Sequence, residues 1–453
     1  MLFSSITFLY LYLPILLLIY YITPTKYKNY ILLVFSIIFY GFETPKFIIM
    51  MGVCITLTYI NGLLIEKWRN KIHYKFSIVL SLLPLIFFKY TNFFIENTNT
   101  LFNTDIKLLK IILPLGISFY TFQMLTYLVD VWRKDMKAEK NFFNLALYVS
   151  FFPQLIAGPI VKYSQVKEQI EHRTQTFYKF NEGIFIFVCG LGKKVLIANQ
   201  LGELCNLYNP TNTTILFTWL YGISYCLQVY FDFSGYSTMA IGIGKMFGFE
   251  LPINFNYPFI CSSIKDFWRR WHITLSSFFK EYVYIPMGGN RVKTSKYIFN
   301  MFIVWFLTGF WHGAAWNFIA WGLLFFVILM IENFIFKDKL NSVFQRILSL
   351  FILIVSFILF GSSNIEIALV TIKNLFKGTI YNNQSLYVLR NYFTIILIGI
   401  IGSTPLFKNF YEKYIKDTNK AIFIEPIFII CILMLSTAYL VDGSFNPFLY
   451  FRF

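Results

Sequence analysis

Two histidines stand out among the residues that could carry chemistry in this chain of 453 residues. His272 and His312 lie in one stretch that opens with FWRRWHITLSSFFKEYVYIPMGGNR and closes with TGFWHGAAWN. His312 falls inside an apolar run, Met301 to Met330, which is typical of membrane-embedded helix. A titratable side chain in such a place is costly and by default marks a functional site. Because histidine changes charge near neutral pH, these residues predict a reaction centre that moves protons.

The residues around His272 have the spacing of one helical face. The four residues at positions i, i+3, i+4 and i+7 are Trp268, Trp271, His272 and Leu275. Arg269 and Arg270 point elsewhere on such a helix. Guanidinium groups suit a phosphorylated ligand, and they equally suit anionic lipid at a membrane surface. The pattern leaves both alternatives open.

The residues around His312 predict close helix packing. Gly309 and Gly313 flank it at GxxxG spacing, which lets a second helix approach closely. Trp311 and Trp316 add aromatic bulk nearby. A single histidine in a helix is more often a packed residue, but membrane depth favours the functional interpretation here.

The composition indicates a membrane protein. Of the residues, 57% are hydrophobic and only 13% are charged, whereas soluble domains carry about 25% charged residues. Apolar runs near the length that crosses a bilayer recur along the chain. We therefore expect an all-α polytopic membrane protein, with one domain over residues 1–453 and roughly eleven to thirteen crossings.

The excess of positive charge fits the same interpretation. The net charge is +17, and the Lys and Arg residues cluster in short loops, as cytoplasmic loops do. This explains the charge better than nucleic acid binding. The six cysteines are scattered without the spacing of a metal site or a disulfide framework. We expect no metal site and no bound cofactor.

The spans are predicted by window length. The expected spans are Phe3–Ile22, Tyr30–Tyr40, Phe47–Leu64, Phe76–Lys89, Leu109–Val131, Gly183–Leu204, Ile215–Phe231, Tyr297–Trp316, Ala320–Phe334, Ile347–Phe360, Thr394–Leu406 and Ile422–Leu440. The segment Tyr90 to Asp105 has no Lys or Arg and is predicted to be an extracytoplasmic loop. Lys193 and Lys194 fall inside the Gly183–Leu204 span, which is unusual.

Two segments are predicted to be re-entrant. Residues 142–160 are apolar but have basic segments on both sides, and they contain Pro153 and Pro159. Proline removes a backbone donor and breaks helix, and broken backbone at membrane depth is tolerated when buried in protein or lining a wet cavity. An ordinary kinked helix is the alternative. Residues 254–298, in the longest basic segment, are the second candidate.

Asp232 lies in the apolar sequence YFDFSGYS. Its carboxylate could bond a catalytic histidine or a backbone amide. It could equally cap a helix at a membrane face, because Asp is a favoured cap. Without nucleotide-binding loops or a serine nucleophile elbow in the chain, the residues leave two classes of protein open. One is a transporter, and the other is an acyltransferase with a histidine base.

Several segments resemble the membrane-bound O-acyltransferase (MBOAT) family, and most of all its bacterial alginate O-acetylase branch. The segments are LPLGISFYTFQMLTYLVDVWR, FFPQLIAGPIVKY, YFDFSGYSTMAIG, NFNYPF, DFWRRWHITLSSFFKEYVYIPMGGNR, TGFWHGAAWNFIAWG and the ending NPFLYFRF. The first hundred residues and Phe334 to Ser436 are similar only as apolar helices.

The resemblance implies a fold and a set of site residues. The family has a ring of tilted helices around a central funnel or tunnel. Its essential histidine corresponds to His312, a general base, and its second motif histidine corresponds to His272, which would orient the thioester or stabilise the oxyanion. Arg269 and Arg270 would receive the donor's phosphates. The other residues expected along the donor path are Trp268, Trp271, Trp311, Asp232 and Asn317.

The resemblance also implies substrates and partners. Such enzymes move an acetyl group from cytoplasmic acetyl-CoA across the bacterial inner membrane, for O-acetylation of an extracytoplasmic exopolysaccharide or peptidoglycan. They act directly or with a partner acetyltransferase or secretion complex. The alternatives are D-alanyl transfer to teichoic acid from a carrier-protein thioester, and a transporter or scaffold without catalysis.

Overall fold

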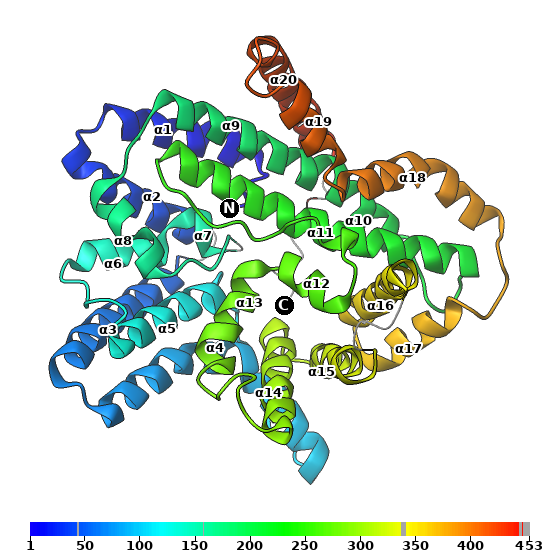
Figure 1. The fold of residues 1–453 in the computed structure, drawn as a ribbon, viewed down its shortest axis with the longest axis horizontal. Coiled ribbons are helices and arrows are strands. Elements are labelled where there is room, and N and C mark those ends of the chain that lie inside the picture. Colours follow the sequence, from blue (N-terminus) through cyan, green and yellow to red (C-terminus); the bar gives the residue numbers. More distant parts are fainter. Residues whose placement is uncertain (43–44, 157, 337–340, 444–445, 447–453) are drawn as a thin grey trace. The chain divides into compact units, whose positions relative to one another are not determined.

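The computed structural model describes residues 1–42, 45–156, 158–336, 341–443 and 446, and each regular element in these ranges is a helix (Figure 1). The all-α prediction is confirmed. The family-like ending that follows Asn446 lies outside the described residues. Two compact units emerge. Unit 1 comprises Met1–Ile184 and Met239–Pro252, and unit 2 comprises Phe185–Thr238 and Ile253–Phe453. The single domain over residues 1–453 stays a prediction.

Unit 1 is built from the N-terminal helices. They are η1 (Phe8–Tyr12), α1 (Leu13–Ile22), η2 (Thr25–Tyr27), α2 (Lys28–Gly41), α3 (Phe47–Trp68), α4 (Lys71–Phe102), α5 (Ile117–Arg133), α6 (Phe142–Ser150), α7 (Phe152–Leu155) and α8 (Tyr163–His172). Two further helices begin in one unit and end in the other. They are α9 (Phe177–Gly192) and α11 (Ile215–Met246).

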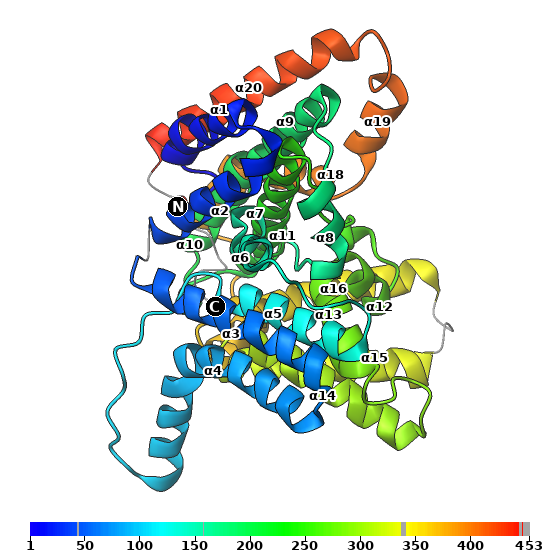
Figure 2. The same ribbon diagram turned by 90° about the vertical axis from the view of Figure 1, so that its left-hand side faces the viewer.

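Helix α4 is longer than predicted. It continues through the segment expected as a loop and ends at Phe102, after which a helix-free stretch leads to α5 (Figure 2). The polar residues of this last part bond to their own helix: the Oγ1 of Thr98 donates to the carbonyl of Phe94 at 2.8 Å. Side chains that satisfy themselves in this way do not end a helix. The loop prediction over Tyr90 to Asp105 was therefore wrong for residues 90–102, and residues 103–105 follow the helix.

The predicted break within residues 142–160 is present. Helix α6 ends at Ser150, and the one-turn helix α7 starts with Pro153 near its first position. A side chain at Gly158 would place its Cβ 2.4 Å from the carbonyl oxygen of Pro153, so only glycine allows this close turn. Residue 157 lies outside the described ranges. A re-entrant course for 142–160 and for 254–298 stays a prediction.

Unit 2 holds both histidines of interest. Its helices are η3 (Lys193–Ala198), α10 (Asn199–Asn206), η4 (Pro258–Ile260), α12 (Ile264–Arg270), α13 (Ile273–Phe279), η5 (Lys280–Tyr284), α14 (Thr294–His312), α15 (Trp316–Ile331), η6 (Glu332–Phe336), α16 (Ser342–Gly361), α17 (Ile365–Asn374), α18 (Asn383–Gly402), α19 (Leu406–Tyr414) and α20 (Ala421–Asp442).

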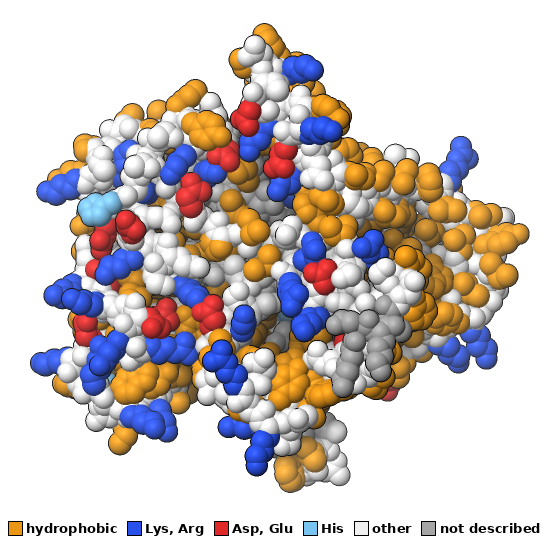
Figure 3. All heavy atoms as spheres, in the orientation of Figure 1, with side chains coloured by type: hydrophobic (Ala, Val, Ile, Leu, Met, Phe, Trp, Pro, Cys, Tyr) orange, Lys and Arg blue, Asp and Glu red, His pale blue; other side chains and the backbone are white. Residues whose placement is uncertain are grey.

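Seven of the described helical segments are long and apolar enough to cross a bilayer. They are Phe47–Trp68, Lys71–Phe102, Phe177–Asn206, Trp316–Phe336, Ser342–Gly361, Asn383–Gly402 and Ala421–Asp442. The chain is a multi-pass membrane protein. Hydrophobic side chains cover the edge formed by α17 and α18 (Figure 3), as lipid contact requires. The count of eleven to thirteen crossings includes shorter helices and stays a prediction.

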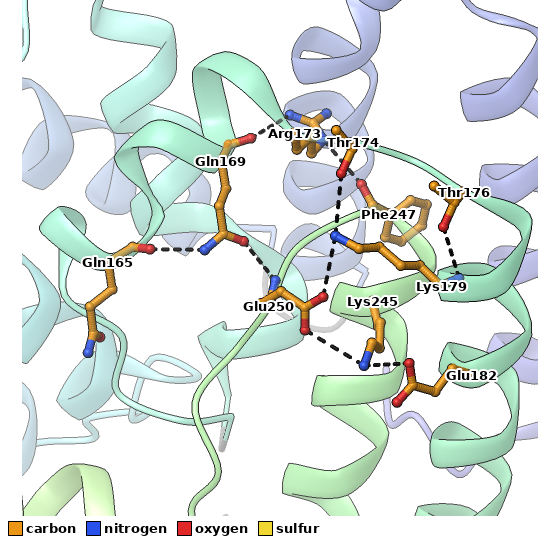
Figure 4. Close-up of polar contacts among 10 residues, drawn as sticks. All are labelled: Gln165, Gln169, Arg173, Thr174, Thr176, Lys179, Glu182, Lys245, Phe247 and Glu250. Carbon is orange, nitrogen blue, oxygen red and sulfur yellow. Dashed lines mark hydrogen bonds and ion pairs between the residues drawn. The ribbon is translucent and has the colours of Figure 1, made fainter. Parts of the chain in front are cut away.

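Unit 1 gathers charged side chains beside α8, the start of α9 and the end of α11 (Figure 4). Lys245 pairs with Glu182 at 2.7 Å and lies 3.7 Å from Glu250. Lys179 lies 3.4 Å from Glu250. The backbone N–H of Glu250 donates to the Oε1 of Gln169 at 2.7 Å. The cluster alternates the two signs of charge.

Helices α14 and α15 of unit 2 form a hairpin with backbone contact. A Cβ at Gly309 would lie 2.4 Å from the carbonyl oxygen of Phe318, and one at Gly322 would lie 2.4 Å from that of Trp305. The close approach predicted at Gly309 is thus confirmed, with Gly322 opposite it. Gly313 instead follows the last residue of α14, where the ring of Phe318 occupies the space a side chain would need.

Candidate active site

One continuous helix was predicted around His272, but the helix is interrupted at this residue. Helix α12 ends at Arg270, and α13 begins at Ile273. The four residues of the predicted face, Trp268, Trp271, His272 and Leu275, are all buried as expected. The backbone of His272 itself is left-handed, with φ 42° and ψ 53°. A residue other than glycine in this region is uncommon and marks a place where the surroundings impose the conformation.

The side chain of His272 is completely buried. Its Nδ1 lies 3.2 Å from the Oδ1 of Asn254. The ring of Phe233 stands edge-on to it with the ring centres 4.6 Å apart. Burial lowers the pKa of His272 from 6.5 to about 3, because an imidazolium ion loses its hydration in such surroundings. His272 is therefore a neutral imidazole at physiological pH.

His312 is the last residue of α14 and is 4% exposed. Three aromatic rings surround it. Trp311 and Trp321 have ring centres 4.9 Å from that of the histidine, and Phe360 has its centre at 5.5 Å. The apolar run that contains His312 is therefore two helices, and the histidine lies at the end of the first. A residue at a helix end can present its side chain beyond the ladder of backbone hydrogen bonds.

Trp311 brings the two histidines into one site. Its ring centre lies 4.9 Å from that of His312 and 6.0 Å from that of His272. All three side chains belong to unit 2. Two imidazoles that contact one indole can address different atoms of a single bound molecule. The two histidines predicted to share a reaction centre are thus placed together.

The other two predicted tryptophans belong to the same aromatic core. The ring centre of Trp268 lies 4.7 Å from that of Trp305 and 5.7 Å from that of Trp321. Trp271 stacks on Phe267 at 5.4 Å. Both are at most 8% exposed. Since Trp321 also contacts His312, Trp268 is joined to the site through one ring. Trp271 is joined to it through Phe255, whose ring contacts both Trp271 and His272.

The two predicted arginines differ in their surroundings. Arg269 is exposed. The Nε of Arg270 donates to Asp266 on the same helix at 3.0 Å, so part of its charge is already paired. A backbone N–H of Ser262 also donates to Asp266, at 3.2 Å. Of the two, Arg269 is the better placed for an anion from solution. Phosphate binding by either residue stays a prediction.

Asp232 is paired with a lysine. Its Oδ1 lies 2.5 Å from the Nζ of Lys194, and the two side chains are 4% and 2% exposed. Asp232 is in the middle of α11, so the helix-cap alternative was wrong. The lysine that looked out of place within an apolar span has this carboxylate as its counter-ion. Intramembrane charges commonly pair in this manner.

Asn317 positions a helix end. Its side-chain Nδ2 donates to the carbonyl oxygen of Ser362 at 2.9 Å, and the residue is 3% exposed. Ser362 caps the C-terminus of α16, which also carries Phe360. Asn317 therefore fixes the helix that supplies one of the rings against His312. A place for it along a donor path stays a prediction.

Sequence reasoning missed three residues that shape this site. Asn254 and Thr274 surround His272, with the Oγ1 of Thr274 donating to the Oδ1 of Asn254 at 3.0 Å. Glu332 caps α12, since its carboxylate accepts the backbone N–H of Ile264 at 2.7 Å and that of Lys265 at 3.0 Å. Only Asn254 had a signal, as a polar residue in the segment NFNYPF.

The chemistry this arrangement supports is acid–base chemistry by buried imidazoles among aromatic rings. No group of three or more His, Cys, Asp or Glu side chains that could hold a metal ion occurs among the residues the structure describes. A neutral imidazole can accept a proton at one nitrogen while it donates at the other.

Comparison with known proteins identifies relatives over most of the chain. Residues 34–361 match the model of MBOAT, the membrane-bound O-acyltransferase family. A probable alginate O-acetylase of Pseudomonas aeruginosa is 37% identical over 389 residues, which covers 81% of this chain and 73% of the relative. One from Azotobacter vinelandii is 35% identical and covers 93% and 88%. A peptidoglycan O-acetyltransferase of Helicobacter pylori is 33% identical and covers 100% and 98%.

Proposed function

The chain belongs to the membrane-bound O-acyltransferase family, and we propose that it moves an acetyl group from cytoplasmic acetyl-CoA to a hydroxyl of an extracytoplasmic polysaccharide. It is an acyltransferase of the membrane. Its relatives are named for alginate and for peptidoglycan, so the acceptor proposed here is an exopolysaccharide or peptidoglycan. The membrane is then the bacterial inner membrane, because acetyl-CoA is cytoplasmic and the acceptor is not.

The observation that carries the proposal is the pair of buried histidines that both contact the ring of Trp311. A hydroxyl is a poor nucleophile until a base removes its proton. His312 would accept that proton as the oxygen attacks the thioester carbonyl. The carbon–sulfur bond then breaks, and the proton passes from the imidazole to the departing thiolate. Such positioned base catalysis contributes about 10²- to 10⁴-fold.

The remaining site residues would bind and orient the donor. His272 would orient the thioester or stabilise the oxyanion. Arg269 and Arg270, at the end of α12, would receive the phosphates of CoA, a role that suits guanidinium geometry. The tryptophans on α12 and α14 would exclude water from the thioester, since hydrolysis competes with transfer. Delivery to the polysaccharide would involve an extracytoplasmic acetyltransferase partner or a secretion complex.

The test is turnover of acetyl-CoA labelled in its acetyl group, with purified protein in nanodiscs. We expect wild-type protein to release CoA and His312→Ala to lose at least about 10²-fold in rate. His172→Ala is the matched control, because His172 is an exposed histidine at the end of α8, and it should keep the full rate. Equal rates for wild-type protein and His312→Ala would exclude His312 as the base.

A donor comparison separates the proposal from its nearest alternative. The same assay is run with a D-alanyl carrier-protein thioester in place of acetyl-CoA. If the protein turns over only the carrier-protein thioester, the proposed reaction becomes D-alanyl transfer and not acetyl transfer. Binding of either donor without any histidine-dependent cleavage, in the presence of purified polysaccharide, would favour a transporter or scaffold.

A further inference from the structure

The segment from Asn254 to Asn256 clamps the break between α12 and α13. The backbone N–H of Asn256 donates to the carbonyl of Arg270 at 2.9 Å, and that of Ile273 donates to the carbonyl of Asn254 at 3.0 Å. His272 lies between these two bonds. They hold its backbone in the left-handed conformation, so its imidazole leaves the chain in a direction that a continuous helix would not allow.

The side-chain amide of Asn254 is held in one orientation, which determines whether its oxygen or its nitrogen faces the imidazole of His272. The backbone N–H of Thr274 lies 3.2 Å from the Oδ1 of Asn254 and donates to it. A backbone N–H has only a proton to offer, so the atom at this position is the amide oxygen and not the amide nitrogen. The hydroxyl of Thr274 donates to the same oxygen at 3.0 Å. The orientation of the amide therefore does not depend on the histidine.

The amide oxygen in turn fixes the proton on His272. The Nδ1 of His272 lies 3.2 Å from this oxygen, which carries no proton. The contact is a hydrogen bond only when Nδ1 is the donor. The imidazole is fully buried and its lowered pKa keeps it neutral. A neutral imidazole has one proton, so Nε2 carries the lone pair.

We infer that Asn254 is a positioning residue that holds His272 in the Nδ1-protonated tautomer, so that Nε2 meets the substrate as a hydrogen-bond acceptor. This excludes one of the two roles considered for His272, because stabilising an oxyanion requires a donor. It favours orientation of the thioester. The identity of the substrate rests on the proposed function, whereas the tautomer does not.

A thioester donor contains groups that can donate a hydrogen bond to Nε2. The acceptor hydroxyl has one proton, and His312 takes it. The arm that carries the thioester in CoA, and equally in a carrier protein, contains secondary amides whose N–H groups are hydrogen-bond donors. One such N–H bonded to Nε2 would fix the arm with its thioester near Trp311. The assignment holds for either donor.

The tautomer can be measured without any substrate. The chain has four histidines, so protein labelled with ¹⁵N only in histidine gives few imidazole signals, and His272→Gln identifies those of His272. We expect a protonated Nδ1 and an unprotonated Nε2 from pH 8 down to pH 5. A proton on Nε2, or an imidazolium signal at pH 6, would overturn the inference.

Variants of the clamp test what the tautomer does. In Asn254→Ala the preference for the Nδ1 proton should be lost, and the KM for the thioester should rise about tenfold, the cost of one hydrogen bond, while kcat changes less than about threefold. Thr274→Val removes one of the two Thr274 donors to the Asn254 oxygen and keeps the backbone N–H, so the loss of the Nδ1 preference and the rise in KM should both be smaller than in Asn254→Ala.

A conservative variant completes the test. Asn254→Asp keeps an acceptor oxygen, so it should retain the Nδ1 proton and restore the KM, which a variant that merely misfolds would not do. A fall in kcat with unchanged KM in Asn254→Ala would overturn the assignment to the thioester arm. Absence of turnover in wild-type protein would contradict the proposed function and leave the ¹⁵N result unaffected.

Discussion

One cluster of polar side chains in each compact unit has surroundings opposite to those of the other. In unit 1, the cations Lys179 and Lys245 are each within 4 Å of a carboxylate, and the carboxylates Glu182 and Glu250 are 33% and 53% exposed. In unit 2, His272 and His312 are 0% and 4% exposed and lie against aromatic rings. Opposite charges at an exposed surface neutralise one another at little cost, whereas burial favours the uncharged form of an imidazole.

The contrast shows what locates a reaction centre. Unit 1 has the denser cluster of titratable groups, but their interactions are with each other and with backbone (Figure 4). The histidines of unit 2 are few, buried and surrounded by rings. Burial among apolar groups is expensive for a polar side chain and is retained where it serves function or a specific structure. The surroundings of titratable groups, and not their number, mark the site.

The buried pair in unit 2 should give the largest effect on stability. Removing one partner, as in Asp232→Leu, leaves Lys194 buried without its counter-ion and should destabilise by about 3–5 kcal/mol. Replacing both residues, with Lys194→Met added, should recover most of this loss, because neither charge is then buried. Thermal unfolding in detergent measures it. A single variant as stable as wild type would remove the distinction between buried and surface pairs.

The hairpin that carries His312 should be the next most sensitive feature. Gly309→Ala would bring a methyl group to within 2.4 Å of the carbonyl oxygen of Phe318. The two helices must separate, at about 1–3 kcal/mol for overpacking, and the rings against His312 move with them. We expect a lower melting temperature and reduced thioester turnover.

Gly52 provides the control for this change. It also lies within a helix, α3, but a Cβ there would meet nothing within 4 Å. Gly52→Ala should keep stability and turnover at or above the wild-type values, since alanine favours helix. Equal behaviour of the two variants would show that the close contact of α14 and α15 does not position the site.

The pH dependence of stability should separate the buried histidine from the surface charges. His272 has a pKa of about 3 when folded, against 6.5 ordinarily. Between these values the unfolded chain binds the extra proton, so stability falls as the pH is lowered through this window and is fully present above pH 6.5. The slope is at most about 1.4 kcal/mol per pH unit.

Melting curves from pH 7 to pH 4 measure this slope. His272→Gln should fall less steeply than wild type, whereas His172→Gln, at an exposed site, should follow the wild-type curve. Parallel curves for His272→Gln and wild type would contradict a neutral buried imidazole.

The smallest effect should come from the surface cluster. Glu250→Gln weakens two ion pairs whose atoms are 3.4 Å and 3.7 Å apart. Exposed pairs contribute about 0–1 kcal/mol, so melting should shift slightly and thioester turnover should not change. A tenfold or greater loss of turnover would show that the charged cluster of unit 1 takes part in the reaction. It would contradict the contrast between this cluster and the buried histidines of unit 2.

Local patterns in the sequence were enough for several features. The apolar runs predicted most of the helices, although the span expected over Leu109–Val131 becomes helical only at Ile117. The spacing around His272 predicted that Trp268, Trp271 and Leu275 are buried. These succeed because hydropathy and helical spacing are local properties. The prediction of a loop from Tyr90 was wrong because it also used only local polarity. Polar side chains that hydrogen-bond to their own helix have the same composition as loop residues.

Other features depended on residues far apart in the chain. The counter-ion of Lys194, the partner of Asn317 and the break at His272 were not visible as patterns, because each depends on a contact made only after folding. Lys194 was noted only as unusual within an apolar span, and no counter-ion was predicted for it. The sequence could not say which carboxylate pairs with it, since several acidic residues lie within reach along the sequence.

Local sequence patterns and family motifs are enough to predict an all-helical membrane acyltransferase and the two histidines proposed for its reaction centre. Residue types and the order of motifs are properties of the chain alone. Only the tertiary structure decided that Trp311 contacts both histidines and that Asn254 holds one of them by a single oxygen. The position of a proton on an imidazole follows from the atom opposite it, and that atom is supplied by folding.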